Sequence, residues 1–269
     1  MNPVTRYVKA QSLSKTQDLT IDAPVSDHPA GVLAGAPNEK IASSDLLGAS
    51  LTRDGCLFRV WAPYARRVTL QLLEGQTPRE HPVERLESGH FVLHTSACAG
   101  DRYFYIIDDN KPVPDPVSRL LPEGVHGPTE IVDPQSFGWS DSDWRGLPLK
   151  DYILYELHVG TFTPEGTFDA AIDKLSYLKE LGVTVIELMP VAAFPGTRNW
   201  GYDGVSPYAV QAGYGVPQGL KRLVDAAHRM GLAVILDVVY NHLGNEGNYL
   251  RFFGPYFTSR HGTRICWSP

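Results

Sequence analysis

Three groups of residues in this sequence have polar or aromatic side chains able to bind or react with a small molecule. They are Glu156 with His158, the segment FPGTRNWGYDGVSPY (194–208), and Asp237 with Asn241 and His242. Each group stands at the end of an apolar run. Polar side chains at the end of a buried strand are typical of a binding site, although they also form structural hydrogen-bond networks.

The second group contains the run Asn199-Trp200-Gly201-Tyr202-Asp203-Gly204. Its two aromatic rings and its acid lie between glycines. A sugar stacks the C–H face of its ring on an aromatic side chain, and its hydroxyl groups need hydrogen-bond donors and acceptors nearby. Trp200 and Tyr202 could equally pack the loop onto the fold, since buried aromatic residues are common. The residues alone leave both interpretations open.

The third group, Asp237, Asn241 and His242, allows three interpretations. A metal site is disfavoured, because this spacing is not a known ligand signature and no other nearby histidine completes it. We therefore predict no metal and no cofactor. A structural network that caps the strand and a site for substrate hydroxyl groups both remain open. His158 taken singly is typical of a satisfied, partly buried histidine, and Glu156 of a structural polar group.

The elements that must position these groups alternate between strand and helix. Three apolar strands are predicted in DYILYELHV (151–159), VTVIELMPV (183–191) and LAVILDVVY (232–240), and two amphipathic helices over 167–182 and 219–231. Thr167 is the expected N-cap of the first helix and Gly182 its end. Its predicted apolar stripe consists of Phe168, Ile172, Leu175, Leu178 and Leu181. Apolar strands alternating with such helices predict a parallel sheet covered by helices.

Two architectures fit this alternation, an open doubly wound sheet and a (β/α)8 barrel. The loop after the first strand, HVGTFTPEGTF, lacks the G-x-G-x-x-G spacing of a dinucleotide site. The connection 192–216 is far longer than the usual few residues. Because barrel enzymes build their sites in the loops that follow the strands, these features favour the barrel.

The region before residue 135 has a different pattern. Short β-branched and aromatic runs at 57–63, 67–75, 90–97 and 101–108 predict a small antiparallel β-sandwich. The segment 111–134 contains six prolines and is expected to be an ordered loop. We thus predict a mobile tail (1–45), a sandwich (46–134), a linker (135–150) and an incomplete barrel (151–269).

Composition excludes several functional classes. The net charge of −6 disfavours binding to nucleic acid or to an anionic membrane, and no apolar run is long enough to span a bilayer. Three widely spaced cysteines fit neither a disulfide framework nor a zinc site. Free thiols and the lack of a signal-peptide pattern predict a cytoplasmic protein.

The motifs together resemble a known family. The segments YELHVGTFTPEGTF (155–168), ELMPVAAFPGTRNWGYDGV (187–205), YGVPQGLKRLVDAAH (214–228) and LDVVYNHLGNEGNYL (236–250) are similar to the first three strand–loop units of the α-amylase superfamily, glycoside hydrolase family 13. Within it, VHGPTEIVDP (125–134), HVGTFTPEGTF (158–168) and NWGYDG (199–204) together resemble the malto-oligosyltrehalose trehalohydrolase family. The run LFRVWAPYARRVTLQL (57–72) resembles the immunoglobulin-like N-terminal sandwich of such enzymes, which is related to carbohydrate-binding modules.

The resemblance implies a role for each site residue. Tyr202 is expected to stack on the sugar where cleavage occurs, and His242 to bond the hydroxymethyl group of that sugar. Trp200 and Asp203 are expected to contact the substrate beside them. Asp237 would orient its neighbours and Asn241 would hold the third loop, with no calcium ion. Glu156 and His158 remain polar groups of the barrel.

The implied activity is that of a retaining α-1,4-glucan hydrolase that releases trehalose from maltooligosyl trehalose. Its nucleophile and acid would come from later strands, and the sequence leaves the family pattern after Thr263. We therefore expect a truncated, inactive chain without catalytic residues, from a frameshift or a shortened gene model, whose outer barrel strands expose apolar faces. Alternatives are a branching or isoamylase-type debranching enzyme, and a non-catalytic α-glucan-binding module.

Overall fold

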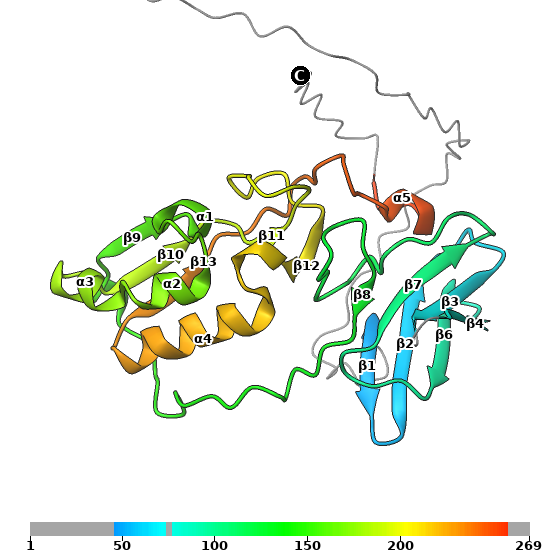
Figure 1. The fold of residues 1–269 in the computed structure, drawn as a ribbon, viewed down its shortest axis with the longest axis horizontal. Helices are drawn as coiled ribbons and strands as arrows, with labels where there is room; N and C mark the ends of the chain where they lie inside the picture. Colours follow the sequence, from blue (N-terminus) through cyan, green and yellow to red (C-terminus); the bar gives the residue numbers. More distant parts are fainter. Residues whose placement is uncertain (1–45, 74–76, 258–269) are drawn as a thin grey trace, which may run out of the picture. The chain divides into compact units, whose positions relative to one another are not determined.

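The computed structural model describes residues 46–73 and 77–257 (Figure 1). The predicted mobile tail (1–45) and the divergent end after Thr263 lie outside the described residues. Within them, an antiparallel β-sandwich comes first along the chain, and a parallel sheet with helices follows.

Two four-stranded sheets form the sandwich, and every strand pair in them is antiparallel. The first sheet has the order β1 (Gly48–Thr52), β2 (Gly55–Trp61), β6 (His90–Thr95) and β5 (Glu84–Arg85). The second has the order β4 (Arg79–Pro82), β3 (Val68–Leu73), β7 (Arg102–Ile107) and β8 (Thr129–Glu130). The four predicted strands are β2, β3, β6 and β7, which lie at the centres of the two sheets.

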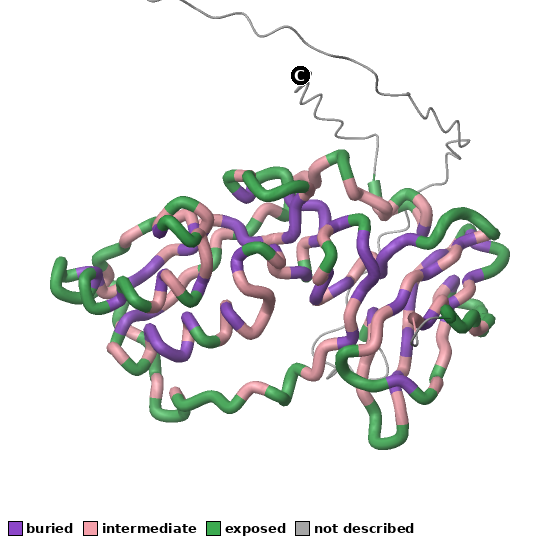
Figure 2. Tube along the Cα trace, viewed as in Figure 1, coloured by how far each residue is buried: buried purple, intermediate pink, exposed green. Residues whose placement is uncertain are grey.

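Strict alternation along β2, β3 and β7 builds the core of the sandwich (Figure 2). On β2, Phe58 and Val60 are buried while Arg59 between them is partly exposed. Leu70 on β3 and Tyr103 on β7 bring the other sheet into the same cluster. Because side chains alternate between the two faces of a strand, a period of two places one complete face of each sheet in the core.

The proline-rich segment 111–134 is ordered, and a buried carboxylate anchors it. Asp115 is 2% exposed; its Oδ2 accepts a hydrogen bond from the Tyr103 hydroxyl at 2.7 Å and its Oδ1 one from the Val117 amide at 2.8 Å. Burial raises the pKa of Asp115 to about 6, although both hydrogen bonds act to lower it. The segment also adds the short strand β8 and a bridge between Val113 and Tyr105.

Three parallel strands form the second sheet, in the order β13 (Ala233–Leu236), β10 (Val185–Leu188) and β9 (Leu154–Leu157). The remaining elements are the helices α1 (Val159–Phe162), α2 (Phe168–Ile172), α3 (Leu175–Glu180), α4 (Val216–Arg229) and α5 (Leu250–Phe253), the hairpin β11 (Ala192–Ala193) and β12 (Ser206–Val210), and the 3-10 turns η2 (Leu149–Asp151) and η3 (Ala212–Tyr214). The predicted parallel sheet with helices is thus present among the described residues. Its closure into a barrel stays a prediction.

The first predicted helix forms two short ones, α2 and α3. Thr167 caps α2, since its hydroxyl accepts the Ala170 amide at 3.2 Å, and Gly182 ends α3 with a φ of +92°. Phe168, Leu175 and Leu178 of the predicted stripe are buried, and Ile172 packs against the same core. Leu181 is 59% exposed, so its prediction was wrong. Because α3 ends at Glu180, Leu181 lies in the closing turn, beyond the part of the helix that covers the sheet.

The two faces of the parallel sheet differ in cover. Leu157, Ile186 and Leu188 face the helices and belong to the same buried cluster as Leu178 and Leu223. The alternate positions, among them the paired Glu156 and Glu187, point to the other face. Apolar side chains on the outer strands β9 and β13, or within four residues of them, are exposed as expected: Ile153, Leu154, Leu236, Val238 and Tyr240.

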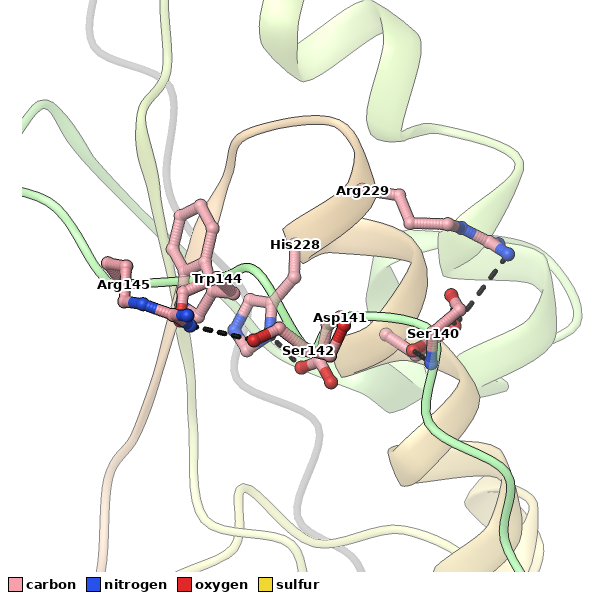
Figure 3. A network of polar contacts seen from close by, with 8 residues as sticks. Ser140, Asp141, Ser142, Trp144, Arg145, His228 and Arg229 are labelled. Atoms are coloured by element: carbon pink, nitrogen blue, oxygen red, sulfur yellow. Dashed lines mark hydrogen bonds and ion pairs between the residues drawn. The ribbon is translucent and has the colours of Figure 1, made fainter.

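The predicted linker (135–150) is fastened along α4 (Figure 3). The backbone amide and hydroxyl of Ser140 donate to the two carboxylate oxygens of Asp225 at 2.7 and 2.8 Å. The Ser140 amide is the main cause that lowers the pKa of Asp225. Asp141 contacts the His228 imidazole at 2.6 Å, and Trp144 stacks on that ring at 4.5 Å between centroids.

Candidate functional site

The carboxyl ends of the three parallel strands bring the predicted residues together. His158 directly follows β9, the loop with Trp200 and Tyr202 follows β10, and Asp237 directly follows β13. Parallel strands end at the same edge of a sheet, so residues far apart in the sequence become neighbours there. Hydrogen bonds link all three predicted groups at this edge.

Tyr202 is held at both ends. Its hydroxyl donates to Asp237 Oδ2 at 3.2 Å, and its backbone oxygen lies 2.8 Å from His242 Nε2. A carbonyl oxygen only accepts hydrogen bonds, so His242 Nε2 carries the proton. Asp237 therefore fixes the phenol of Tyr202, and His242 fixes its backbone.

Asn199 shapes the turn that carries Tyr202. Its Oδ1 accepts hydrogen bonds from the amides of Gly201 at 2.7 Å and Asp203 at 3.4 Å, and its Nδ2 donates to Asp203 Oδ2 at 3.2 Å. The Gly201 bond closes an Asx-turn. The sequence analysis named Asn199 only as part of the loop; an asparagine two positions before a glycine is the signal that could have identified this role.

Gly201 is required by its surroundings. Its φ is +98°, and an added Cβ would lie 2.3 Å from the backbone oxygen of Pro190. Only glycine fits a backbone of this shape at such close range. The close approach places the turn directly against the end of β10.

The aromatic rings of the loop stay open to solvent. Trp200 is 63% exposed and Tyr202 is 40% exposed. Asp203, also exposed, lies beside Tyr202 with its carboxylate on Asn199. Two accessible aromatic faces next to carboxylate and amide groups can accept a sugar ring, as the residue types suggested.

Negative charge surrounds the Tyr202 phenol. Its pKa is raised, first by burial, then by the hydrogen bond to Asp237, and then by the charges of Asp237, Glu156 and Glu187. Tyr202 therefore remains a protonated donor at neutral pH. Glu187 on β10 is the register partner of Glu156 on the neighbouring strand β9, and it was not identified from the sequence.

The roles that the resemblance implies for His242 and Asn241 stay predictions. His242 uses Nε2 on the Tyr202 backbone, and its Nδ1 is buried without a hydrogen-bond partner among the described residues. The expected contact with a sugar hydroxymethyl group stays a prediction, and it requires the imidazole to be uncovered. Asn241 is exposed, and within residues 46–73 and 77–257 its side chain makes no hydrogen bond that holds the loop.

A small cavity of about 140 Å³ lies beside the loop. Its walls are mostly apolar and include Pro190, Tyr208, Val238 and Tyr240, with Asp237 at the edge. Beyond Asp237 and the two tyrosine hydroxyl groups, these walls offer few donors and acceptors for a sugar, so exposed Trp200 and Tyr202 are the better candidate surface.

Two further features concern the described ranges as a whole. No three histidine, cysteine, aspartate or glutamate side chains gather there as ligands of a metal ion would. Among the helices that the structure describes, none combines the length and apolar character needed to cross a bilayer.

Comparison with known proteins matches both parts of the chain. The family model of carbohydrate-binding module 48, the isoamylase N-terminal domain, matches residues 46–134. The model of the alpha amylase catalytic domain matches residues 131–254.

Among curated relatives, malto-oligosyltrehalose trehalohydrolase of Saccharolobus solfataricus is 54% identical over 80% of this chain and 38% of its own length. The enzyme of that name from Deinococcus radiodurans is 47% identical over 92% of this chain and 39% of its own. The chain therefore spans about two fifths of the length of these relatives. A 1,4-alpha-glucan branching enzyme of Corynebacterium jeikeium is 32% identical over 75% of the chain and 30% of its own length.

Solved structures of enzymes that act on glucans or are named for such an activity are also similar to this chain. The crystal structure of a candidate alpha amylase from Salmonella typhimurium matches with a TM-score of 0.78 and 45% identity, covering 81% of this chain and 37% of that one. A pullulanase from Anoxybacillus, solved in complex with maltotetraose, matches with a TM-score of 0.66 and 26% identity, covering 78% and 37%.

Proposed function

The chain belongs to the α-amylase family, and from this premise we propose that it forms the substrate-binding part of a retaining α-1,4-glucan hydrolase. The proposed type is the malto-oligosyltrehalose trehalohydrolase, which releases trehalose from maltooligosyl trehalose. Its substrate is thus an α-glucan that carries a non-reducing trehalose unit where an ordinary maltooligosaccharide has its reducing end.

The clamp on Tyr202 is the observation that carries the proposal. Asp237 and His242 hold the ring and backbone of Tyr202, while the face of the ring and that of Trp200 remain accessible. A rigid aromatic platform loses little conformational freedom when a sugar stacks on it, so more of the contact energy is left for binding. Asp203 and, once uncovered, His242 Nδ1 would receive sugar hydroxyl groups.

The proposal gives the described residues a binding role and no catalytic one. A retaining mechanism needs two carboxyl groups about 5 Å apart, one as nucleophile and one as acid. Near Tyr202, the carboxylate of Asp237 already accepts the phenol, and that of Asp203 accepts an amide of the turn. We also propose that the parallel sheet belongs to a (β/α)8 barrel, with the site at its carboxyl end.

Two alternatives are less well supported. A branching or debranching enzyme would share the layout, but the branching enzyme is 32% identical whereas the trehalohydrolase of Saccharolobus solfataricus is 54% identical. A glucan-binding module would need exposed aromatic residues on the sandwich. Among the described residues of 46–134, Tyr64 is the aromatic residue with a largely exposed side chain. A cytoplasmic location, suggested by free Cys56 and Cys98, is part of the proposal.

Isothermal titration of the full chain with three glucans tests the proposed substrate. Maltooligosyl trehalose is expected to bind more tightly than unmodified maltotetraose, and a branched limit dextrin more weakly than either. Tyr202→Ala should abolish binding, and Tyr64→Ala should leave it intact. Preference for the branched dextrin would favour the branching enzyme, and loss of binding only in Tyr64→Ala would favour the sandwich as the binding module. Trehalose release by this chain would contradict a purely binding role.

A further inference from the structure

His158 connects three separate segments beside the loop that carries Trp200 and Tyr202. Its Nε2 lies 2.8 Å from the backbone oxygen of Asn199 and 3.0 Å from the Tyr214 hydroxyl, and its Nδ1 lies 3.1 Å from the Thr161 hydroxyl. These partners come from α1, the loop after β10, and η3. One half-buried imidazole therefore ties together elements that no continuous secondary structure joins.

The partners determine that Nε2 of this imidazole carries a hydrogen. Because the Asn199 oxygen can only accept, Nε2 must carry a hydrogen, which the Tyr214 oxygen shares as a second acceptor. Nδ1 is then free to accept the hydrogen of the Thr161 hydroxyl. A hydrogen on Nε2 thus serves the Asn199 and Tyr214 contacts, and the Thr161 hydroxyl serves the contact at Nδ1.

Asn199 passes this restraint to the turn. Its backbone oxygen is held by His158, while its side chain bonds the Gly201 amide and the Asp203 carboxylate. Tyr202 lies between these two residues. A shift of the Asn199 backbone is therefore expected to disturb the turn that places the Tyr202 phenol beside Asp237.

His158 also supports Trp200 directly. The two ring centroids are 5.0 Å apart at an interplanar angle of 59°, although 63% of Trp200 is exposed. Gly160 makes this arrangement possible, because a Cβ there would lie 3.0 Å from both the His158 and Tyr214 rings. The indole thus rests on the imidazole and keeps the rest of its surface open.

We propose that His158 is a positioning residue for the glucan platform, fixing Trp200 by ring contact and Tyr202 through Asn199. It acts without contacting the sugar itself. The role in glucan affinity rests on the proposed function, whereas the effect on the loop does not depend on any ligand.

The test uses the full chain and three variants. His158→Ala removes every contact, whereas the amide nitrogen of His158→Gln can still donate to the Asn199 oxygen but offers no ring to Trp200. His94→Ala is the matched control, since this sandwich histidine also bonds a hydroxyl, that of Thr52 at 2.9 Å. NMR follows the Trp200 indole signal and the hydrogen exchange of the Gly201 amide, and titration with maltotetraose gives the affinity.

In His158→Ala, loss of the network should speed exchange at Gly201 about fivefold or more and weaken maltotetraose binding about tenfold. His158→Gln should restore slow exchange at Gly201 but leave the Trp200 signal shifted, and His94→Ala should match the parent chain. If His158→Ala does not fold, the proposal is tested by His158→Gln alone, through the hydrogen exchange of the Gly201 amide and the Trp200 indole signal.

Unchanged Gly201 exchange and Trp200 signal in a folded His158→Ala chain would overturn the proposal. So would a Gln variant that loosens Gly201 while leaving the Trp200 signal in place. If the parent chain binds no maltotetraose but His158→Ala frees the loop, the positioning role stands and the proposed function fails.

Discussion

Replacing Gly201 by alanine tests the geometry of the site more sharply than removing any side chain. The new Cβ would lie 2.3 Å from the Pro190 oxygen, whereas ordinary contact begins at 3.4 Å, so the two groups must separate by about 1.1 Å. This oxygen belongs to the backbone two residues beyond the end of β10, and backbone cannot shift as easily as the end of a flexible side chain. The turn that carries Tyr202 must therefore move.

The expected magnitude follows from two terms. A non-glycine residue at this positive φ costs about 1–3 kcal/mol. Loss of the hydrogen bond from the Gly201 amide to Asn199 adds about 1 kcal/mol. Gly201→Ala should thus lower the free energy of unfolding by about 2–4 kcal/mol and weaken maltotetraose binding about tenfold or more.

Gly196→Ala, in the same loop, is the control. Gly196 also has a positive φ, +74°, but an added Cβ there meets nothing within 4 Å. Its variant should lose about 1 kcal/mol of stability from backbone strain and bind glucan normally. Urea unfolding and calorimetric titration measure both effects. Equal behaviour of the two variants in both assays would refute the close approach at Gly201 as the cause.

Three further outcomes are expected in urea unfolding. The pKa of Asp115 in the folded chain, about 6, exceeds its ordinary value of 3.8. Its contribution to the free energy of unfolding is therefore present below pH 4 and is lost as the pH rises through 6, by up to about 3 kcal/mol. An Asp115→Asn variant whose stability changes with pH in the same way as that of the parent chain would contradict this. Asp225→Ala should lower the free energy of unfolding by about 2–4 kcal/mol, because the amide and hydroxyl of Ser140 lose their acceptor. Arg229→Ala, on the same helix but with a side chain that is 59% exposed, should lower it by less than about 0.5 kcal/mol. Leu178→Ala should lower the free energy of unfolding by about 2–5 kcal/mol, because Leu178 is fully buried, whereas Leu181→Ala should lower it little. Similar losses in the two variants would mean that Leu181 belongs to the buried stripe after all.

The elements that the sequence predicted well are those with a strong local period. The alternation on β2 and the run that forms β10 were recognised because burial imposes a period of two or a continuous apolar run. β4 and β5 were missed because both are short and mostly exposed, so their composition is that of a loop. Thr167 and Gly182 ended the first helix region as predicted, but the break between α2 and α3 has no comparable sequence signal.

The sequence singled out residues that the structure brings together, but it did not indicate how they are connected. Tyr202, Asp237 and His242 stood out as polar or aromatic groups at strand ends, and the structure brings all three together. The contacts of His158 span 41 and 56 positions in the sequence, and no local pattern carries such information. The attachment of the linker to α4 was missed for the same reason.

The central claim, that the loop 199–203 binds an α-glucan, is tested most directly by mapping NMR shifts of the full chain during titration with maltooligosyl trehalose. The Trp200 indole and the amides of Tyr202 and Asp203 are predicted to shift saturably, with β2 and β6 unaffected. Shifts confined to the sandwich, or no saturable shift at millimolar glucan, would contradict the claim.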